Sequence, residues 1–266
     1  MSITTPIFRR GKHFTAAVCN GQSLTAMTNQ EALNAMRQAD LSNDHRILVW
    51  SWMGDAGVPA RYTSGKWVRL DSLGPQLVSM GHGVARTLAA AGHNVALIDV
   101  AYGGKGLNAY WRKGQPGYAI LTGQVNAALA SLGFGNTWEW GPFVRYQAHA
   151  DCASVAAAET YAGLLPTHMA DLRADLTGAT NMPFVIGRAP DWGTSTRPAD
   201  ALASIRAAQV SIAEADGNAT WFDTDGCLVA GSEAPFTWGA TLDGTHPTAP
   251  ARFRNGMRGA NAWLDM

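Results

Sequence analysis

Serine, histidine and aspartate side chains that together could cleave an ester stand near opposite ends of the 266-residue chain. Ser23 occupies a corner between an apolar run at 14–18 and a helix-like run that begins at Leu24. A serine hydroxyl becomes a useful nucleophile when an imidazole takes its proton and a carboxylate fixes the tautomer of that imidazole. Asp243 and His246 have the spacing for this task, because both can lie in one loop with Nε2 left for Ser23. The pattern indicates acyl-transfer chemistry at a serine.

Each of these motifs also has an ordinary structural interpretation. Gly21-Gln22-Ser23 before a helix is typical of a turn and a helix N-cap. Asp243 and His246 taken alone are typical of a turn with a surface histidine. The two motifs indicate an enzyme only in combination. Cys19, which lies close to Ser23, is expected to be a small buried apolar residue rather than a second nucleophile.

The charge balance narrows the classes of partner. The chain has 20 Lys and Arg residues against 20 Asp and Glu residues, and its basic residues form no long run. We therefore expect neither a nucleic acid nor an anionic membrane surface as the partner. No stretch has the length and apolarity of a transmembrane span or of a signal peptide, which leaves the cytoplasm and export by another route as open locations. The oligomeric state is not indicated.

The potential metal-binding residues are scattered. The three cysteines are too few and too far apart for a disulfide framework or a zinc site, which fits a reducing compartment. His149, Asp151 and His168 lack the tight spacing of metal ligands and are expected on a loop and a helix face. The sequence therefore predicts neither a metal nor another cofactor.

Short apolar runs alternate with longer helix-like runs along the whole chain. This rhythm predicts an α/β protein with a parallel sheet covered on both faces, in one domain over 1–266. Strands are predicted at 14–18, 46–50, 94–100, 138–146, 183–187 and 219–223. Helices are predicted at 24–39, 75–91, 118–132, 154–176, 199–215 and 249–264. A Gly/Trp-rich excursion at 51–73 is expected to form a surface loop with a hairpin around 62–67 and to help shape a binding site.

Four sequence blocks, in this order, resemble those of the SGNH (GDSL-type) hydrolases, and among them the sialate O-acetylesterase-like carbohydrate esterases. The blocks span nearly the whole chain and are Gly21-Gln22-Ser23, Gly103-Gly104, Gln147-Ala148-His149 and Asp243 to His246. The resemblance implies a three-layer α/β/α sandwich with a parallel, flavodoxin-like five-stranded sheet. It also implies a metal-independent serine esterase that removes acetyl groups from O-acetylated carbohydrate through an acetyl-enzyme intermediate.

The resemblance assigns roles residue by residue. Ser23 would be the nucleophile, His246 its general base and Asp243 the carboxylate that orients the imidazole. The oxyanion hole would consist of the N–H of Ser23, the N–H of Gly104 and the side-chain amide of Gln147. Core packing is the alternative role for every tryptophan that could stack on a sugar ring. The residues expected to contact substrate are Gln22, Gly103, His149, Trp52 and Trp111.

The chain departs from the family pattern in two blocks. Ala148 replaces a glycine and His149 an acidic residue, and Lys105-Gly106 stands where family members tend to have small hydroxyl residues. These departures keep open a catalytically impaired glycan-binding module, or a tail- or surface-associated structural module, of the same fold. An SGNH lipase or thioesterase is a third reading, although no long apolar acyl-binding stretch stands out.

Overall fold

Five parallel strands form the centre of one sheet. The computed structural model describes residues 11–21, 45–55, 58–62, 65–70, 79–190, 197–225 and 249–266. The central strands lie in the order β5-β1-β6-β7-β8. Counted along the chain these five strands have the order 2-1-3-4-5, which is the flavodoxin-like arrangement that the family resemblance implies. The strands are β1 (His13–Gly21), β5 (Val95–Tyr102), β6 (Thr137–Tyr146), β7 (Phe184–Gly187) and β8 (Ala219–Phe222).

The predicted count of five strands is wrong, because the sheet continues beyond β5. Strand β2 (Ile47–Asp55) pairs with β5 in parallel and makes a sixth parallel strand. Strands β3 (Val58–Tyr62) and β4 (Val68–Arg69) both pair antiparallel with β2, in place of the hairpin predicted between them. An apolar run in the sequence predicts a strand but carries no information on which neighbour it pairs with, and so the added edge was missed.

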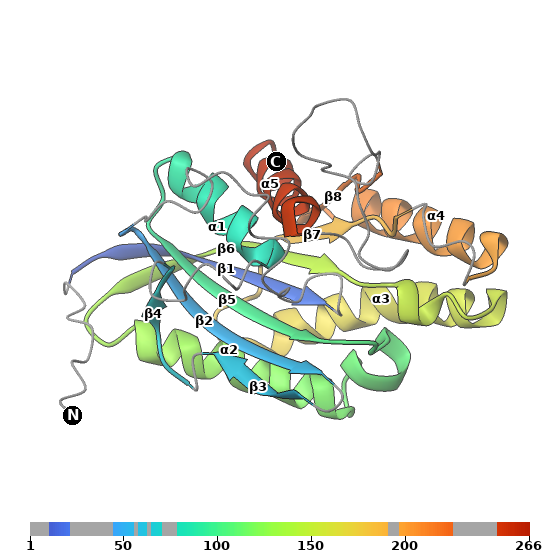
Figure 1. The fold of residues 1–266 in the computed structure, drawn as a ribbon, viewed down its shortest axis with the longest axis horizontal. Coiled ribbons are helices and arrows are strands. Elements are labelled where there is room, and N and C mark those ends of the chain that lie inside the picture. The colour runs from blue at the N-terminus through green and yellow to red at the C-terminus, as the bar shows by residue number, and fades with distance from the viewer. Residues whose placement is uncertain are drawn as a thin grey trace.

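Helices cover both faces of the sheet and give the predicted three layers (Figure 1). On one face lie α1 (Met80–Ala90) and α5 (Ala249–Leu264). On the other face lie α2 (Pro116–Leu132) and α3 (Val155–Asp175), and α4 (Ala199–Ala215) packs against α3 and β8. The predicted bounds of α4 and α5 are confirmed. Within the described ranges, no helix is both long and apolar enough to pass through a membrane.

Two glycines allow α1 and α5 to touch along their backbones. A Cβ atom on Gly83 of α1 would lie 2.0 Å from the carbonyl oxygen of Phe253 in α5. A Cβ atom on Gly256 of α5 would lie 2.0 Å from the carbonyl oxygen of Met80 in α1. Only hydrogen fits at both positions, so this pair of glycines fixes how close α5 comes to α1.

The carboxyl ends of the central strands meet at one end of the sheet (Figure 1). The last residue of β1, Gly21, is in register with Ala101 of β5 on one side and with Tyr146 of β6 on the other. Short helical turns follow both neighbours, η4 (Leu107–Trp111) after β5 and η5 (His149–Asp151) after β6. Ligand sites of open parallel sheets form at this end, where the strand order reverses direction about the first strand. The second and third sequence blocks both fall here.

Candidate active site

The structure describes two of the four sequence blocks that make up the predicted site. Gln22, Ser23, Asp243 and His246 lie outside the described residues. The two remaining blocks, Gly103-Gly104 and Gln147-Ala148-His149, are described and come directly after β5 and β6. Ser23 is the second residue after β1, the strand that these two flank. The candidate oxyanion groups and the candidate nucleophile therefore follow three adjacent strands.

Gly104 makes the turn at the end of β5. Its φ of +68° lies in the left-handed region that favours glycine. The residue is exposed to solvent, and no atom lies within 4 Å of the position that a Cβ would take. The turn lies directly after β5, and the role of its N–H as an oxyanion donor stays a prediction.

Gln147 follows β6, and its side-chain amide is held on both sides. Its Oε1 accepts a hydrogen bond from Arg145 at 3.2 Å, and its Nε2 donates a short bond to the Asp151 carboxylate. The same Nε2 lies 3.5 Å from the carbonyl oxygen of Lys105, the residue after Gly104. The structure thus brings the amide of Gln147 to the turn that contains Gly104, a residue 43 positions earlier in the sequence.

Asp151 connects the two loops. It is buried, and its carboxylate accepts hydrogen bonds from the backbone N–H groups of Leu107 at 2.9 Å and Asn108 at 3.4 Å. Gly106 permits this approach, because a Cβ there would lie 2.6 Å from an Asp151 carboxylate oxygen. The carboxylate therefore holds the turn after Gly104 and the amide of Gln147 together.

The backbone of Gln147 is also fixed. Its carbonyl oxygen accepts hydrogen bonds from the Tyr161 hydroxyl and from Gln209 Nε2, both at 3.2 Å. Burial raises the pKa of Tyr161 to about 12, so the phenol stays protonated and able to donate. Gln209 in turn accepts from the backbone N–H of Ala189 at 2.7 Å, which links the Gln147 loop to the end of β7.

Arg145 belongs to β6 and stands two residues before Gln147. The side chain is completely buried, and it donates a short hydrogen bond to Oδ1 of Asn20, its register partner in β1. Asn20 in turn donates to the carbonyl oxygen of Val100 in β5 at 2.9 Å. A fully buried arginine therefore links β1, three residues before Ser23, to Gln147.

Two of the residues predicted to contact substrate, Trp111 and His149, have buried side chains. Trp111 has no exposed surface and lies in the core, its ring 5.1 Å from that of Tyr110, so the prediction that it contacts substrate is wrong. His149 is 7% exposed, and its backbone carbonyl accepts from Arg197. Trp52 is partly exposed and lies 6.0 Å from the ring of Tyr102, at the same end of the sheet as Gly103.

Two other groups with possible chemistry are inert in this environment. Burial raises the pKa of Cys19 well above its usual value, and this fully buried thiol is the small apolar residue that the sequence predicted. Burial, helped by Arg145, lowers the pKa of His168 well below its usual value, so this histidine is a neutral core residue. Within the described ranges, no cluster of three or more His, Cys, Asp or Glu side chains is placed to hold a metal ion.

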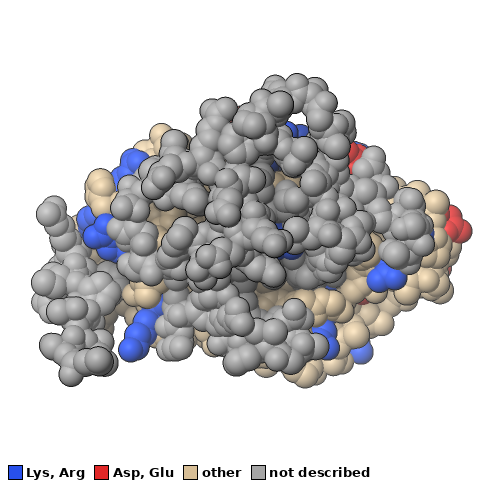
Figure 2. Space-filling view, in the orientation of Figure 1, with Lys and Arg blue, Asp and Glu red and all other residues tan. Residues whose placement is uncertain are grey.

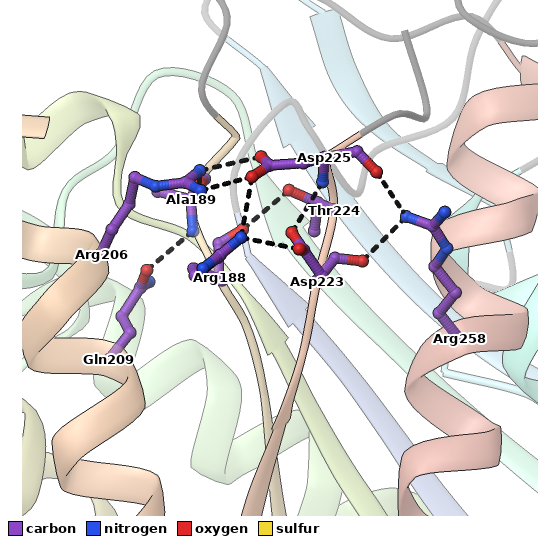
Figure 3. A network of polar contacts seen from close by, with 8 residues as sticks. All are labelled: Arg188, Ala189, Arg206, Gln209, Asp223, Thr224, Asp225 and Arg258. Carbon is purple, nitrogen blue, oxygen red and sulfur yellow. Dashed lines mark hydrogen bonds and ion pairs between the residues drawn. The ribbon is translucent and has the colours of Figure 1, made fainter. Parts of the chain in front are cut away.

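A second polar network lies at the carboxyl ends of β7 and β8 (Figure 3). Arg206 of α4 donates to both carboxylate oxygens of Asp225, and Arg188 bridges Asp223 at 2.6 Å and Asp225 at 2.8 Å. Arg258 of α5 donates to the backbone carbonyl oxygens of Asp223 and Asp225 at 2.9 and 2.8 Å. The network joins the chain on either side of the sequence 226–248, which carries Asp243 and His246.

Charge on the visible surface is dispersed. In the view of Figure 2, the Lys and Arg side chains of the described residues lie in small separate groups rather than in one continuous patch. The charges most closely connected to the candidate site are instead buried, namely Arg145 and Asp151.

Sequence reasoning missed the residues that hold Gln147. Arg145 stands in the apolar run of β6, and a charge inside a buried strand is a signal that it has a specific partner. Asp151 stands four residues after Gln147 and was considered only as a metal ligand. The partners could not be found from the sequence, because Asn20 lies 125 positions from Arg145.

The family comparison covers nearly the whole chain. A model of the family described as "Carbohydrate esterase, sialic acid-specific acetylesterase" matches residues 17–265. A search of the curated proteins found no match.

Several solved structures share the fold at low sequence identity. A protein from Arabidopsis thaliana has a TM-score of 0.67 at 18% identity, covering 94% of this chain and 98% of that chain. NanS has a TM-score of 0.65 at 15% identity, with 97% and 98% covered. A carbohydrate acetylesterase from Xanthomonas citri has a TM-score of 0.60 at 16% identity, where the match covers 95% of this chain and 57% of the other. At such identities the likeness shows a common fold.

Proposed function

The chain belongs to the family of sialic acid-specific carbohydrate acetylesterases and is a carboxylic ester hydrolase, and from this premise we propose that it removes O-acetyl groups from carbohydrate with a Ser23, His246 and Asp243 triad. The substrate is an O-acetylated sugar, and the products are acetate and the sugar hydroxyl. The proposal extends over the single domain 1–266.

The reaction proceeds in two steps, acylation of the enzyme and its deacylation by water. Ser23 Oγ attacks the acetyl carbonyl carbon while His246 Nε2 takes the hydroxyl proton, and Asp243 stabilises the imidazolium. The tetrahedral intermediate collapses, the bond to the sugar oxygen breaks, and His246 returns the proton to that oxygen. Water then attacks the acetyl-enzyme with His246 again as the base, which releases acetate and restores Ser23.

The oxyanion of each intermediate is stabilised by three donors. These are the N–H of Ser23, the N–H of Gly104 and Nε2 of Gln147. Donors held in place before the reaction are worth more than mobile ones, because they need not reorganise as charge develops. The hydrogen bonds to the side chain and backbone of Gln147 provide this rigidity.

The observation that carries the proposal is the approach of Gln147 to the turn after β5 that contains Gly104. Gln147 Nε2 lies 3.5 Å from the carbonyl oxygen of Lys105, next to Gly104. Ser23 follows the end of β1 by two residues, at the carboxyl end where β5 and β6 present these groups. Trp52 and Tyr102 supply aromatic surface at the same end, which suits a sugar ring.

Acetate release tests the proposal. Purified protein, Ser23→Ala and the matched control Ser131→Ala are incubated with O-acetylated sialic acid and with acetylated neutral sugars, in the presence of a chelator. We expect release by the first and third proteins, none by Ser23→Ala, and a rate that rises through about pH 6.5 as the imidazole loses its proton. Ser131 is an exposed residue of α2 and serves as a neutral substitution.

Other outcomes would point to the other readings. Near-normal release by Ser23→Ala would refute the nucleophile. Glycan binding without release by any of the three proteins would favour a binding module of the same fold. A strong preference for long-chain esters over acetyl esters would favour a lipase or thioesterase.

A further inference from the structure

We propose that Arg145 is a positioning residue for the esterase reaction: together with Asp151 it fixes the amide of Gln147 in one orientation. This inference rests on the proposed function of Gln147 as an oxyanion donor. It assigns a role to residues that none of the four sequence blocks contains.

The orientation of the amide follows from the chemistry of its two neighbours. Arginine can only donate hydrogen bonds, and an ionised carboxylate can only accept them. Oε1 of Gln147 faces the guanidinium of Arg145, and Nε2 faces the carboxylate of Asp151. A flipped amide would place NH₂ against a donor and oxygen against a carboxylate, which loses both bonds at once. Gln147 therefore has one stable orientation, with its Nε2 toward Asp151 and the Lys105 carbonyl oxygen.

One of the two Nε2 hydrogens remains available for substrate. The first is used by the short bond to Asp151. The second points toward the Lys105 carbonyl at 3.5 Å, the outer limit of a hydrogen bond. A developing oxyanion near Gly104 can replace this weak contact with a strong charge-assisted one. The hydrogen bond to Asp151 thus holds the amide through one Nε2 hydrogen and leaves the other for the reaction.

The guanidinium also keeps its charge without a direct ion pair. Among the described residues no carboxylate lies within 4.0 Å of its nitrogens, and its Nε has no hydrogen-bond partner there. Burial lowers the pKa of Arg145, whereas the Tyr161 hydroxyl and Asp151 favour the charged form. Arginine remains charged even so, because its ordinary pKa is very high. The guanidinium therefore faces Oε1 of Gln147 as a donor only, which is what fixes the amide.

A double-mutant cycle separates positioning from simple support of the fold. Arg145→Met keeps most of the side-chain length and removes charge and donors. In the wild-type background we expect kcat to fall about tenfold to a hundredfold with KM changed less than about threefold, since one oxyanion donor is worth about 10² to 10³ in kcat. In the Gln147→Ala background, where no amide remains to be positioned, we expect a further loss below about threefold. Arg145→Lys should restore part of kcat, because an ammonium can again donate to Oε1 of Gln147.

Asp151→Asn is the second variant and keeps the proposal testable if Arg145→Met does not fold. An asparagine can present NH₂ to Gln147, so the orientation is no longer fixed, and we expect kcat to fall about tenfold in wild type and not in Gln147→Ala. Equal fractional losses in both backgrounds would overturn the proposal in favour of a structural role, and so would unchanged kcat in Arg145→Met. Failure of the proposed function has a different signature: Ser23→Ala would retain activity, or the wild type would release no acetate, which overturns both.

Discussion

The hydroxyl of Ser79 donates a short hydrogen bond to the carboxylate of Asp99, which ties the N-cap of α1 to the middle of β5. The backbone N–H of Ser79 donates to Nδ1 of His82 at 2.9 Å, and all three residues are buried. Burial raises the pKa of Asp99 to about 7 and lowers that of His82 to about 4. Between about pH 4 and 6.5 the folded state holds one proton more than the unfolded state at Asp99 and one fewer at His82, so the two effects on stability cancel.

Asp99→Asn should expose the effect of His82. The folded pKa of about 4 lies below the unfolded value, so the unfolded state binds more protons and stability is lost as the pH falls from 6.5 toward 4. We expect the free energy of unfolding of Asp99→Asn to rise with pH over this range by about 1.4 kcal/mol per pH unit. Urea titrations at half-unit steps measure it. A curve parallel to that of the wild type would contradict the assignment.

His82→Asn should expose the opposite effect of Asp99. The folded pKa of about 7 lies above the unfolded value, so stability is fully present below about pH 4 and is lost as the pH rises toward 7. Asparagine can still accept the Ser79 N–H through its Oδ1. The same titrations should give a slope of similar size and reversed sign. If the free energy of unfolding changed with pH in the same direction in both variants, titrating groups other than Asp99 and His82 would dominate.

Gly83→Ala should separate α5 from α1. A methyl group 2.0 Å from the Phe253 carbonyl cannot be accommodated without moving a helix, and we expect a loss of about 3 kcal/mol or more in the free energy of unfolding. Gly123→Ala in α2 is the matched control, because no atom lies within 4 Å of its Cβ position. The control should stabilise the helix by up to about 1 kcal/mol. The melting temperatures of both variants test this prediction. Equal values would show that Gly83 is not in close contact with α5.

Asp225→Asn should weaken both the fold and catalysis. It removes the carboxylate shared by Arg188 and Arg206, and we expect a loss of about 1 to 3 kcal/mol in stability. We also expect a lower kcat with little change in KM, since Asp225 directly precedes the sequence that carries the candidate general base. Asp171→Asn, which removes a longer and more exposed contact with Lys113 at 3.8 Å, should cost less than about 1 kcal/mol and leave kcat unchanged. A wild-type kcat in Asp225→Asn would show that the network does not influence the triad.

The sequence predicted those parts of the fold that depend on local periodicity. Helices α4 and α5 begin and end where the pattern of apolar residues begins and ends, and each predicted strand of the central sheet is present. Sheet edges depend instead on pairing between distant segments, and therefore the place of β2 beside β5 was not predicted.

In the candidate site, too, the features that depend on local sequence were predicted and those that depend on distant segments were not. The sequence blocks around Gly104 and Gln147 are short and local, and the family resemblance assigned both residues as candidate oxyanion donors from them. Whether an aromatic ring faces solvent or core is not local, and Trp111 was assigned to the wrong place. The charged residues inside strands, Arg145 and Asp99, were visible in the sequence, but their partners come from other elements.

The bond between Asn20 and Arg145 has a consequence for how the two positions can change during evolution. Loss of the arginine alone leaves the amide oxygens of Asn20 and Gln147 buried without their donor, and loss of Asn20 alone leaves part of a buried guanidinium unpaired. Each single change passes through a less stable protein, whereas replacing both by apolar residues leaves only the Gln147 oxygen without its donor. Related sequences should therefore carry the amide and the arginine together or lack both, so that two residues 125 positions apart are inherited as one unit.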